Sequence, residues 1–197
     1  MTLFSQAIAY AARMHEGAVR KGTAVPYIVH PMEAAAIAAT LTTDPSVLAA
    51  AVLHDVIEDC GVSEAELAAQ FGARVAHLVM SETQLHRGDP RETWESRKRE
   101  ALEKIAMGDR EVKILALSDK LSNMRAIRRD YHRLGAALFA RFNQHDPSMH
   151  AWYYRSCRDL LKEELGNTEA FEEFRGHVED VFGSLAPLEG ESAARAV

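Results

Sequence analysis

The spacing of apolar residues is the feature that most constrains the fold of this chain. Apolar side chains, many of them Ala and Leu, recur three and four positions apart along most of the sequence. That period places them on one face of an α-helix, and no stretch has a strong strand–turn–strand pattern. The sequence therefore predicts an all-α fold. The expected helices cover residues 3–18, 31–42, 45–59, 63–80, 94–106, 109–130, 134–143, 147–165 and 168–182.

Some of the predicted helix ends carry recognisable signals. Pro45 follows Asp44, which is a good N-cap residue, and Ser63 with Glu66 fits the spacing of a capping box. Gly72 is expected to bend or break the helix predicted after Ser63.

The chain reads as a single helical-bundle domain with a short extension. Its 197 residues suffice for a sizeable core, and residues 1–182 are predicted to form that domain. Residues 183–197, GSLAPLEGESAARAV, are expected to be a mobile C-terminal tail. The polar stretch 84–93, QLHRGDPRET, is expected to be a long loop.

Composition excludes several classes of protein. The sequence has no run of about 18 apolar residues, so a membrane span is not expected. The N-terminus does not resemble a secretory signal, and a cytoplasmic location is therefore expected. A net charge of −6 argues against general nucleic-acid binding, but it allows a small anion in a local basic pocket. The two cysteines, Cys60 and Cys157, lie far apart in the sequence, which fits a reducing compartment.

The stretch AAAVLHDVIEDC, residues 49–60, combines a buried run with ionisable groups. His54, Asp55, Glu58 and Asp59 follow directly on the apolar residues. On one continuous helix, their three- and four-residue spacings would make a polar patch around the helix end. Burying such groups is costly unless water, a partner side chain or a metal ion compensates.

Two further residues indicate that a metal ion is the compensating partner. His30 follows the short apolar run in VPYIVHP, and Asp119 ends the apolar run in VKILALSD. Two His and two Asp side chains make a mixed N/O set that suits a borderline divalent metal such as Mn, Fe, Zn, Ni or Co. The alternative is a set of solvated helix ends with ordinary salt bridges.

Three segments give the chain a specific resemblance. VRKGTAVPYIVHP (19–31), AAAVLHDVIED (49–59) and ALSDKLSNMRAI (116–127) resemble the HD-domain metal-dependent phosphohydrolases. Within that family they look most like the hydrolase domain of RelA/SpoT enzymes and the small alarmone hydrolases. The resemblance runs from about residue 5 to about residue 182, and it implies an all-α HD domain.

The resemblance implies roles for the charged residues. It makes His30, His54, Asp55 and Asp119 metal ligands, with Mn²⁺ as the implied ion, and it places Glu58 and Asp59 beside the attacking water. The implied reaction removes the 3′-pyrophosphate from ppGpp, leaving GDP and pyrophosphate.

The resemblance also implies nucleotide contacts. Arg20 and Lys21 match the family's RK pair, with the arginine stacked on the base, and Asn123 matches a position that contacts a sugar hydroxyl. For Arg97 and Lys98, pyrophosphate contact and a solvated helix face both stay open. The aromatic stretch Trp152–Arg155 could close over a base, but core packing is the preferred interpretation.

One departure leaves the substrate open. Many relatives have Asp after Thr where this chain has Gln84, in SETQLH. Alternatives are therefore another nucleotide, such as pppApp or NADPH, a catalytically silent nucleotide sensor, and a purely structural bundle. No membrane partner is expected, and a homo-oligomer stays open.

Overall fold

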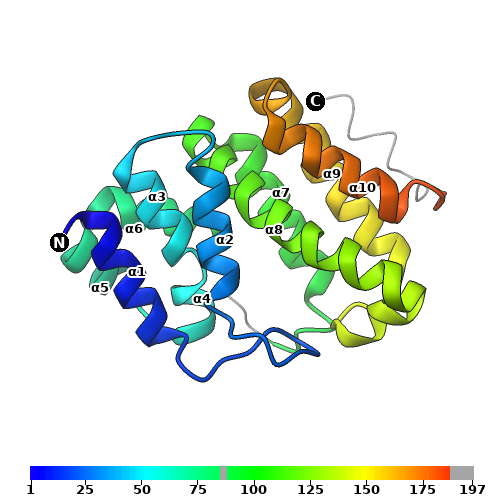
Figure 1. Cartoon of the computed structure of the whole chain (residues 1–197), viewed down its shortest axis with the longest axis horizontal. Helices are drawn as coiled ribbons and strands as arrows, with labels where there is room; N and C mark the ends of the chain where they lie inside the picture. The colour runs from blue at the N-terminus through cyan, green and yellow to red at the C-terminus, as the bar shows by residue number, and fades with distance from the viewer. Residues whose placement is uncertain (85–87, 187–197) are drawn as a thin grey trace.

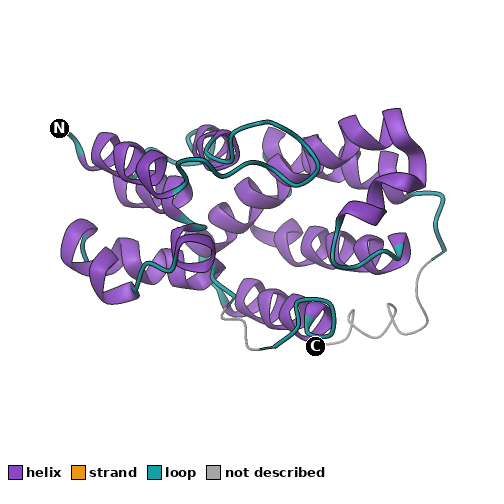
Figure 2. Cartoon of the chain, turned by 90° about the horizontal axis from the view of Figure 1, so that it is seen from below, coloured by secondary structure: helices purple, strands orange, loops and turns teal. Residues whose placement is uncertain are grey.

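The computed structural model describes residues 1–84 and 88–186, and in these residues all regular secondary structure is helical (Figures 1 and 2). The predicted all-α class is confirmed, and an isolated β-bridge joins Val19 and Pro26. The elements are α1 (Leu3–Met14), α2 (Val29–Ala38), α3 (Pro45–Leu53), α4 (Val56–Cys60), α5 (Glu64–Phe71), α6 (Ala73–Glu82), α7 (Trp94–Met107), α8 (Arg110–Leu134), the 3₁₀ helix η1 (Gly135–Arg141), α9 (Pro147–Leu165) and α10 (Glu169–Phe182).

The sequence signals at the helix ends are confirmed. The Asp44 side chain accepts a 2.8 Å hydrogen bond from the Ser46 amide at the start of α3. Ser63 and Glu66 form the reciprocal bonds of a capping box at the start of α5. Gly72 separates α5 from α6. Its φ is +92°, a backbone conformation that favours glycine.

The single helix predicted for residues 45–59 is wrong. The structure divides it into α3 and α4 at His54 and Asp55. The carbonyl of Ala51, the usual acceptor for the Asp55 amide in a continuous helix, lies 2.8 Å from His54 Nδ1. The His54 side chain thus bonds to a backbone carbonyl at the point where the helix breaks. The helix predicted for residues 134–143 also differs in the structure. Gly135, with φ +57°, ends α8, and a 3₁₀ helix follows.

Helix α8 is the central element of the fold. It packs against α2 and α3 on one side and against α9 and α10 on the other (Figure 1). Helices α1 and α6 pack against α3, α5 packs against α6, and α7 lies against α9. The core includes fully buried Leu53, Leu117 and Phe139. This arrangement brings the start of α2, the α3–α4 junction and the middle of α8 together.

The chain ends are described in part. Helix α10 ends at Phe182, and the predicted tail lies outside the described residues from 187 onward. The expected 84–93 loop lies outside them at residues 85–87. Among the helices of the described part, none is long and apolar enough to cross a membrane.

Candidate functional site

Four side chains from three parts of the fold converge on one point. His30 Nε2 lies 3.0 Å from Asp119 Oδ1, and His54 Nε2 lies 3.0 Å from Asp55 Oδ2. The two Nε2 atoms are 3.3 Å apart. Neighbouring ligands of an ion with bonds near 2.1 Å and right-angle geometry lie about 3 Å apart. His30, His54 and Asp55 therefore have the chemistry and spacing for one divalent metal. Asp119 Oδ1 approaches the same group from α8, 3.0 Å from His30 Nε2 and 3.6 Å from His54 Nε2.

Hydrogen bonds on the outer side of each ring aim both histidines at this point. His54 Nδ1 lies 2.8 Å from the Ala51 carbonyl, which can only accept. His30 Nδ1 lies 2.8 Å from Ser122 Oγ, whose hydroxyl donates to Glu33 Oε2 at 2.7 Å. Each Nδ1 therefore carries the proton when the ring is neutral, and each Nε2 lone pair faces the site.

The electrostatics of the cluster favour a cation. Burial raises the pKa of Asp119, but Lys120 and the two histidines outweigh burial and hold that pKa well below its ordinary value. Burial lowers the pKa of His54, but the carboxylates of Asp55 and Asp119 raise it well above its ordinary value. The same field that favours a proton on His54 favours a divalent ion between these groups.

Lys120 is a buried partner of the cluster. Its ammonium lies 2.7 Å from Asp119 Oδ2 and 2.8 Å from Glu82 Oε2. Lys120 thus holds one oxygen of Asp119 and leaves Oδ1 for the site. Asn123 Nδ2 donates to the same Oδ1 at 2.6 Å.

Glu58 and Asp59 lie on α4, one turn after Asp55. Glu58 lines the cavity beside the cluster, and its Oε2 accepts a 3.1 Å hydrogen bond from the Gln84 amide. Loss of hydration and the nearby Asp55 carboxylate raise the pKa of Asp59 to about 6. The Tyr27 hydroxyl donates to Asp55 Oδ2 at 2.7 Å, so this tyrosine closes the wall beside both carboxylates.

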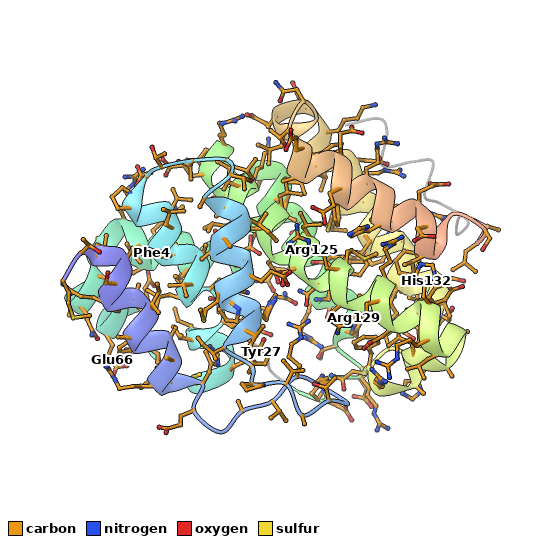
Figure 3. All side chains as sticks on the ribbon, viewed as in Figure 1. Phe4, Tyr27, Glu66, Arg125, Arg129 and His132 are labelled. Atoms are coloured by element: carbon orange, nitrogen blue, oxygen red, sulfur yellow. The ribbon has the colours of Figure 1, made fainter. Side chains whose placement is uncertain are left out.

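A cavity of about 430 Å³ extends from the cluster, a size typical of small-molecule sites. Every residue that the sequence predicted for the site lines it: Arg20, Lys21, His30, His54, Asp55, Glu58, Asp59, Asp119 and Asn123. Figure 3 labels Tyr27, before α2, and Arg129, on α8, which both contribute to its wall. The ligand, catalytic and nucleotide-binding roles of these residues remain predictions.

Arg20 and Asn123 form one continuous part of the wall. Arg20 Nη2 donates to Asn123 Oδ1 at 2.9 Å, and Asn123 in turn reaches Asp119. The segment that carries Arg20 and the helix that carries Asp119 are thereby joined at the cavity. Both side chains offer polar groups to a ligand that also reaches the metal position.

The cations at the start of α7 differ in side-chain direction. Arg97 and Lys98 line the cavity, whereas Arg99 pairs with Glu95 on the outer face of the helix. The Lys98 ammonium lies 4.8 Å from the centre of the Tyr153 ring. Two cations of this stretch therefore face the site.

The aromatic stretch on α9 is mainly core. Tyr153 and Tyr154 are buried and also line the cavity, but Trp152 packs against Trp94 with ring centres 6.5 Å apart. Arg155 donates to the carbonyls of Phe182 and Leu185 at the end of α10.

Sequence reasoning did not identify Ser122, Glu33 and Glu82, which hold the cluster from outside. Ser122 and Glu33 support His30, and Lys120 with Glu82 supports Asp119. A signal existed for two of them, because Ser122 follows Asp119 by three positions and Glu33 follows His30 by three, which is a one-turn spacing. Glu82 had no such signal, since only the packing of α6 on α8 brings it to Lys120.

Comparisons with known proteins agree on one family. A model of the HD domain matches residues 7–147. The chain is 36% identical over 132 residues to a GTP pyrophosphokinase of Myxococcus xanthus, covering 64% of this chain. It is 38% identical over 125 residues to a guanosine-3′,5′-bis(diphosphate) 3′-pyrophosphohydrolase of Vibrio cholerae, covering 62% of this chain. In both cases it spans only 17% of the relative's own length.

Two solved structures are similar over nearly their whole length. A crystal structure of a protein from Listeria monocytogenes EGD-e has a TM-score of 0.70 at 28% identity, covering 81% of this chain and 99% of that one. A metazoan ortholog of SpoT, described as hydrolysing ppGpp, has a TM-score of 0.69 at 26% identity, covering 91% and 94%.

Proposed function

Because this chain belongs to the HD domain family, we propose that it is a metal-dependent phosphohydrolase that removes the 3′-pyrophosphate of ppGpp. One observation carries the proposal: the Glu58 carboxylate and the four-residue cluster line a single cavity of nucleotide size. The activities named for the Vibrio protein and the metazoan protein support the choice of substrate. The cytoplasmic location expected from the sequence belongs to the same proposal.

His30, His54, Asp55 and Asp119 would hold the ion, and Mn²⁺ is the ion proposed for this mixed N/O set. When bound, a divalent ion lowers the pKa of coordinated water and offsets charge on the attacked phosphate. The outer hydrogen bonds of the two rings keep both Nε2 atoms aimed at the ion.

Glu58 would take the proton from the attacking water. Its carboxylate is fixed by the Gln84 amide and stands one turn after Asp55. Water oxygen forms the new bond to phosphorus, and the bond between phosphorus and the ribose 3′ oxygen breaks. The proton passes from Glu58 to that oxygen, so the products are GDP and pyrophosphate. Asp59, beside Tyr27, would help to orient the water.

The substrate would lie with its base toward Arg20 and its ribose near Asn123. The planar guanidinium of Arg20 suits stacking on a base, and its bond to Asn123 sets its place in the wall. Lys21 lines the same part of the cavity. Lys98 and Arg97, from α7, would face the pyrophosphate.

A substrate panel tests this proposal. The purified protein would be incubated with Mn²⁺ and ppGpp, pppApp, NADPH, dNTPs or cyclic nucleotides, with products resolved by ion exchange. We expect GDP and pyrophosphate from ppGpp. If ppGpp is untouched while another nucleotide is cleaved, the guanosine assignment is wrong and the phosphohydrolase class stands. Tight nucleotide binding by metal-loaded protein with no cleavage would instead support a silent sensor.

A further inference from the structure

Gln84 is held in place by three different elements. It follows Thr83 at the end of α6, and its backbone amide donates to Glu58 Oε2 on α4 at 3.1 Å. Lys104 Nζ, from α7, donates to the Thr83 carbonyl at 2.6 Å. The Thr83 hydroxyl donates to the Val79 carbonyl at 2.9 Å. The backbone of residue 84 is thereby fixed against the cavity wall.

The Gln84 side chain has an unusual environment for an amide. It lines the cavity and is only 8% exposed, and its Oε1 has no hydrogen-bond partner within residues 1–84 and 88–186. A buried polar atom of this kind loses its hydration without compensation, so such atoms are rare and call for an explanation. An apolar side chain of the same length would avoid that loss. The amide is therefore best explained by something that enters the cavity.

The place of Gln84 on the wall indicates which part of a substrate it would meet. Its backbone amide bonds directly to Glu58, whereas Arg20 bonds to Asn123, which in turn bonds to Asp119. Lys98 lines the same cavity from α7. A group beside Glu58 meets the reacting phosphate rather than the base.

Building on the proposed function, we propose that the Gln84 amide contacts the phosphorylated end of the substrate and helps to determine which nucleotides the site accepts. An amide offers N–H donors and a carbonyl acceptor without a charge. A carboxylate here, as the family resemblance leads one to expect, would place a negative charge beside the substrate's phosphates. A neutral residue suits a substrate whose anionic end lies close to this wall. Gln84 is thus a specificity-determining residue.

Two substitutions at Gln84 separate contact from simple filling of space. Gln84→Met keeps length and removes polarity, while Gln84→Glu keeps shape and adds a charge. Gln70→Glu is the control, because Gln70 is exposed on α5 and does not line the cavity. The probes are inorganic pyrophosphate and GDP, titrated into protein loaded with Mn²⁺ after the metal content of each variant has been verified.

We expect Gln84→Glu to weaken pyrophosphate binding by about tenfold or more, because a like charge would face the ligand. GDP binding should change less than pyrophosphate binding. Gln84→Met should weaken pyrophosphate binding roughly three- to tenfold, the size of one lost hydrogen bond. It should also raise Tm by roughly 2–4 °C, because it removes the unpaired buried oxygen. Gln70→Glu should change neither ligand's affinity.

The result that overturns the inference is unchanged pyrophosphate binding in both Gln84 variants, or an equal loss for pyrophosphate and GDP. A fall in Tm for Gln84→Met would show a structural amide and would also overturn it. These measurements do not depend on turnover of ppGpp. If the native protein fails to cleave ppGpp while the variants lose pyrophosphate affinity as expected, the proposed substrate falls and the role of Gln84 stands.

Discussion

Ser122 Oγ lies 2.8 Å from His30 Nδ1, on the side of the imidazole ring that faces away from the site. The serine hydroxyl donates to Glu33, so it must accept its hydrogen bond from the histidine. That bond fixes the proton on Nδ1 and leaves the Nε2 lone pair facing the position between His30 and Asp119 that a cation would take. A residue of α8 therefore sets the orientation of a ligand on α2.

Ser122→Ala tests this support. The substitution frees the His30 ring, and loss of such outer partners typically costs about 10–100-fold in metal affinity. We expect a loss of that size in competition titrations of Mn²⁺ against a chelator. Ser118→Ala is the matched control, because Ser118 is also buried on α8 but bonds to the Ile114 carbonyl and does not line the cavity. Equal affinities for the native protein and the Ser122 variant would contradict this account.

Glu58→Gln separates chemistry from binding. The substitution keeps the shape of the side chain and removes the charge that takes the proton, so we expect a loss of about 10²–10⁴-fold in kcat. Metal content and nucleotide affinity should stay near native. Asp55→Ala should instead lose the metal, as elemental analysis would show. A native rate in the Glu58 variant would exclude Glu58 as the base.

Lys120→Met tests the buried ion pair beside the site. Its removal leaves the carboxylates of Asp119 and Glu82 buried without their cation, and breaking such a pair typically costs about 3–5 kcal/mol. We expect a loss of this size in urea unfolding of metal-free protein, and a smaller loss with Mn²⁺ present. Arg99→Met removes an exposed pair with Glu95 and a contact with the Trp152 ring, and it should cost about 1 kcal/mol or less. Similar losses for the two variants would contradict this difference.

The sequence predicts the helices and the members of the cluster because both depend on local patterns. The three- and four-residue period located the helices, and ionisable residues at the ends of apolar runs located His54 and Asp119. The ends of α3 and α5 followed from capping residues. Local spacing did not predict the break at Asp55, where the His54 side chain bonds to the Ala51 carbonyl.

The supporting residues depend on contacts between distant helices. Glu82 meets Lys120 because α6 packs on α8, and nothing near either residue in the sequence signals the pair. Gln84 was recognised only as a departure from the family pattern. Its buried oxygen, which has no partner among the described residues, could be recognised only from the structure of the cavity wall.

Arg20→Ala tests the proposed base end of the cavity. Base contacts are made in both the ground state and the transition state, so we expect KM to rise with little change in kcat. Loss of one stacked cation should cost roughly 1–2 kcal/mol, measured by steady-state kinetics on each nucleotide that is cleaved. Arg13→Ala, on α1 outside the cavity lining, should have no effect. An unchanged KM for every substrate would mean that the base lies elsewhere.

Lys98 should make anion binding depend on pH. Loss of hydration, with the nearby Lys120 ammonium, lowers the pKa of Lys98 to about 8. Lys98 is therefore charged below pH 8 and loses its proton as the pH rises through that value. A bound pyrophosphate raises the Lys98 pKa again, because it favours the ammonium form. Binding above pH 8 should then take up a proton, and affinity should fall as pH increases.

Lys98→Arg isolates this contribution, because a guanidinium keeps its charge throughout the range. The measurement is a calorimetric titration of pyrophosphate into Mn²⁺-loaded protein at values from roughly pH 7 to 9. This range spans the lowered pKa of Lys98 and stays below the ordinary lysine pKa of about 10.4. We expect the native affinity to fall more steeply than that of Lys98→Arg. Buffers of different ionisation enthalpy should show extra proton uptake by the native protein alone. The two proteins share their metal ligands and Glu58, so matching pH profiles would place the Lys98 ammonium outside contact with the anion.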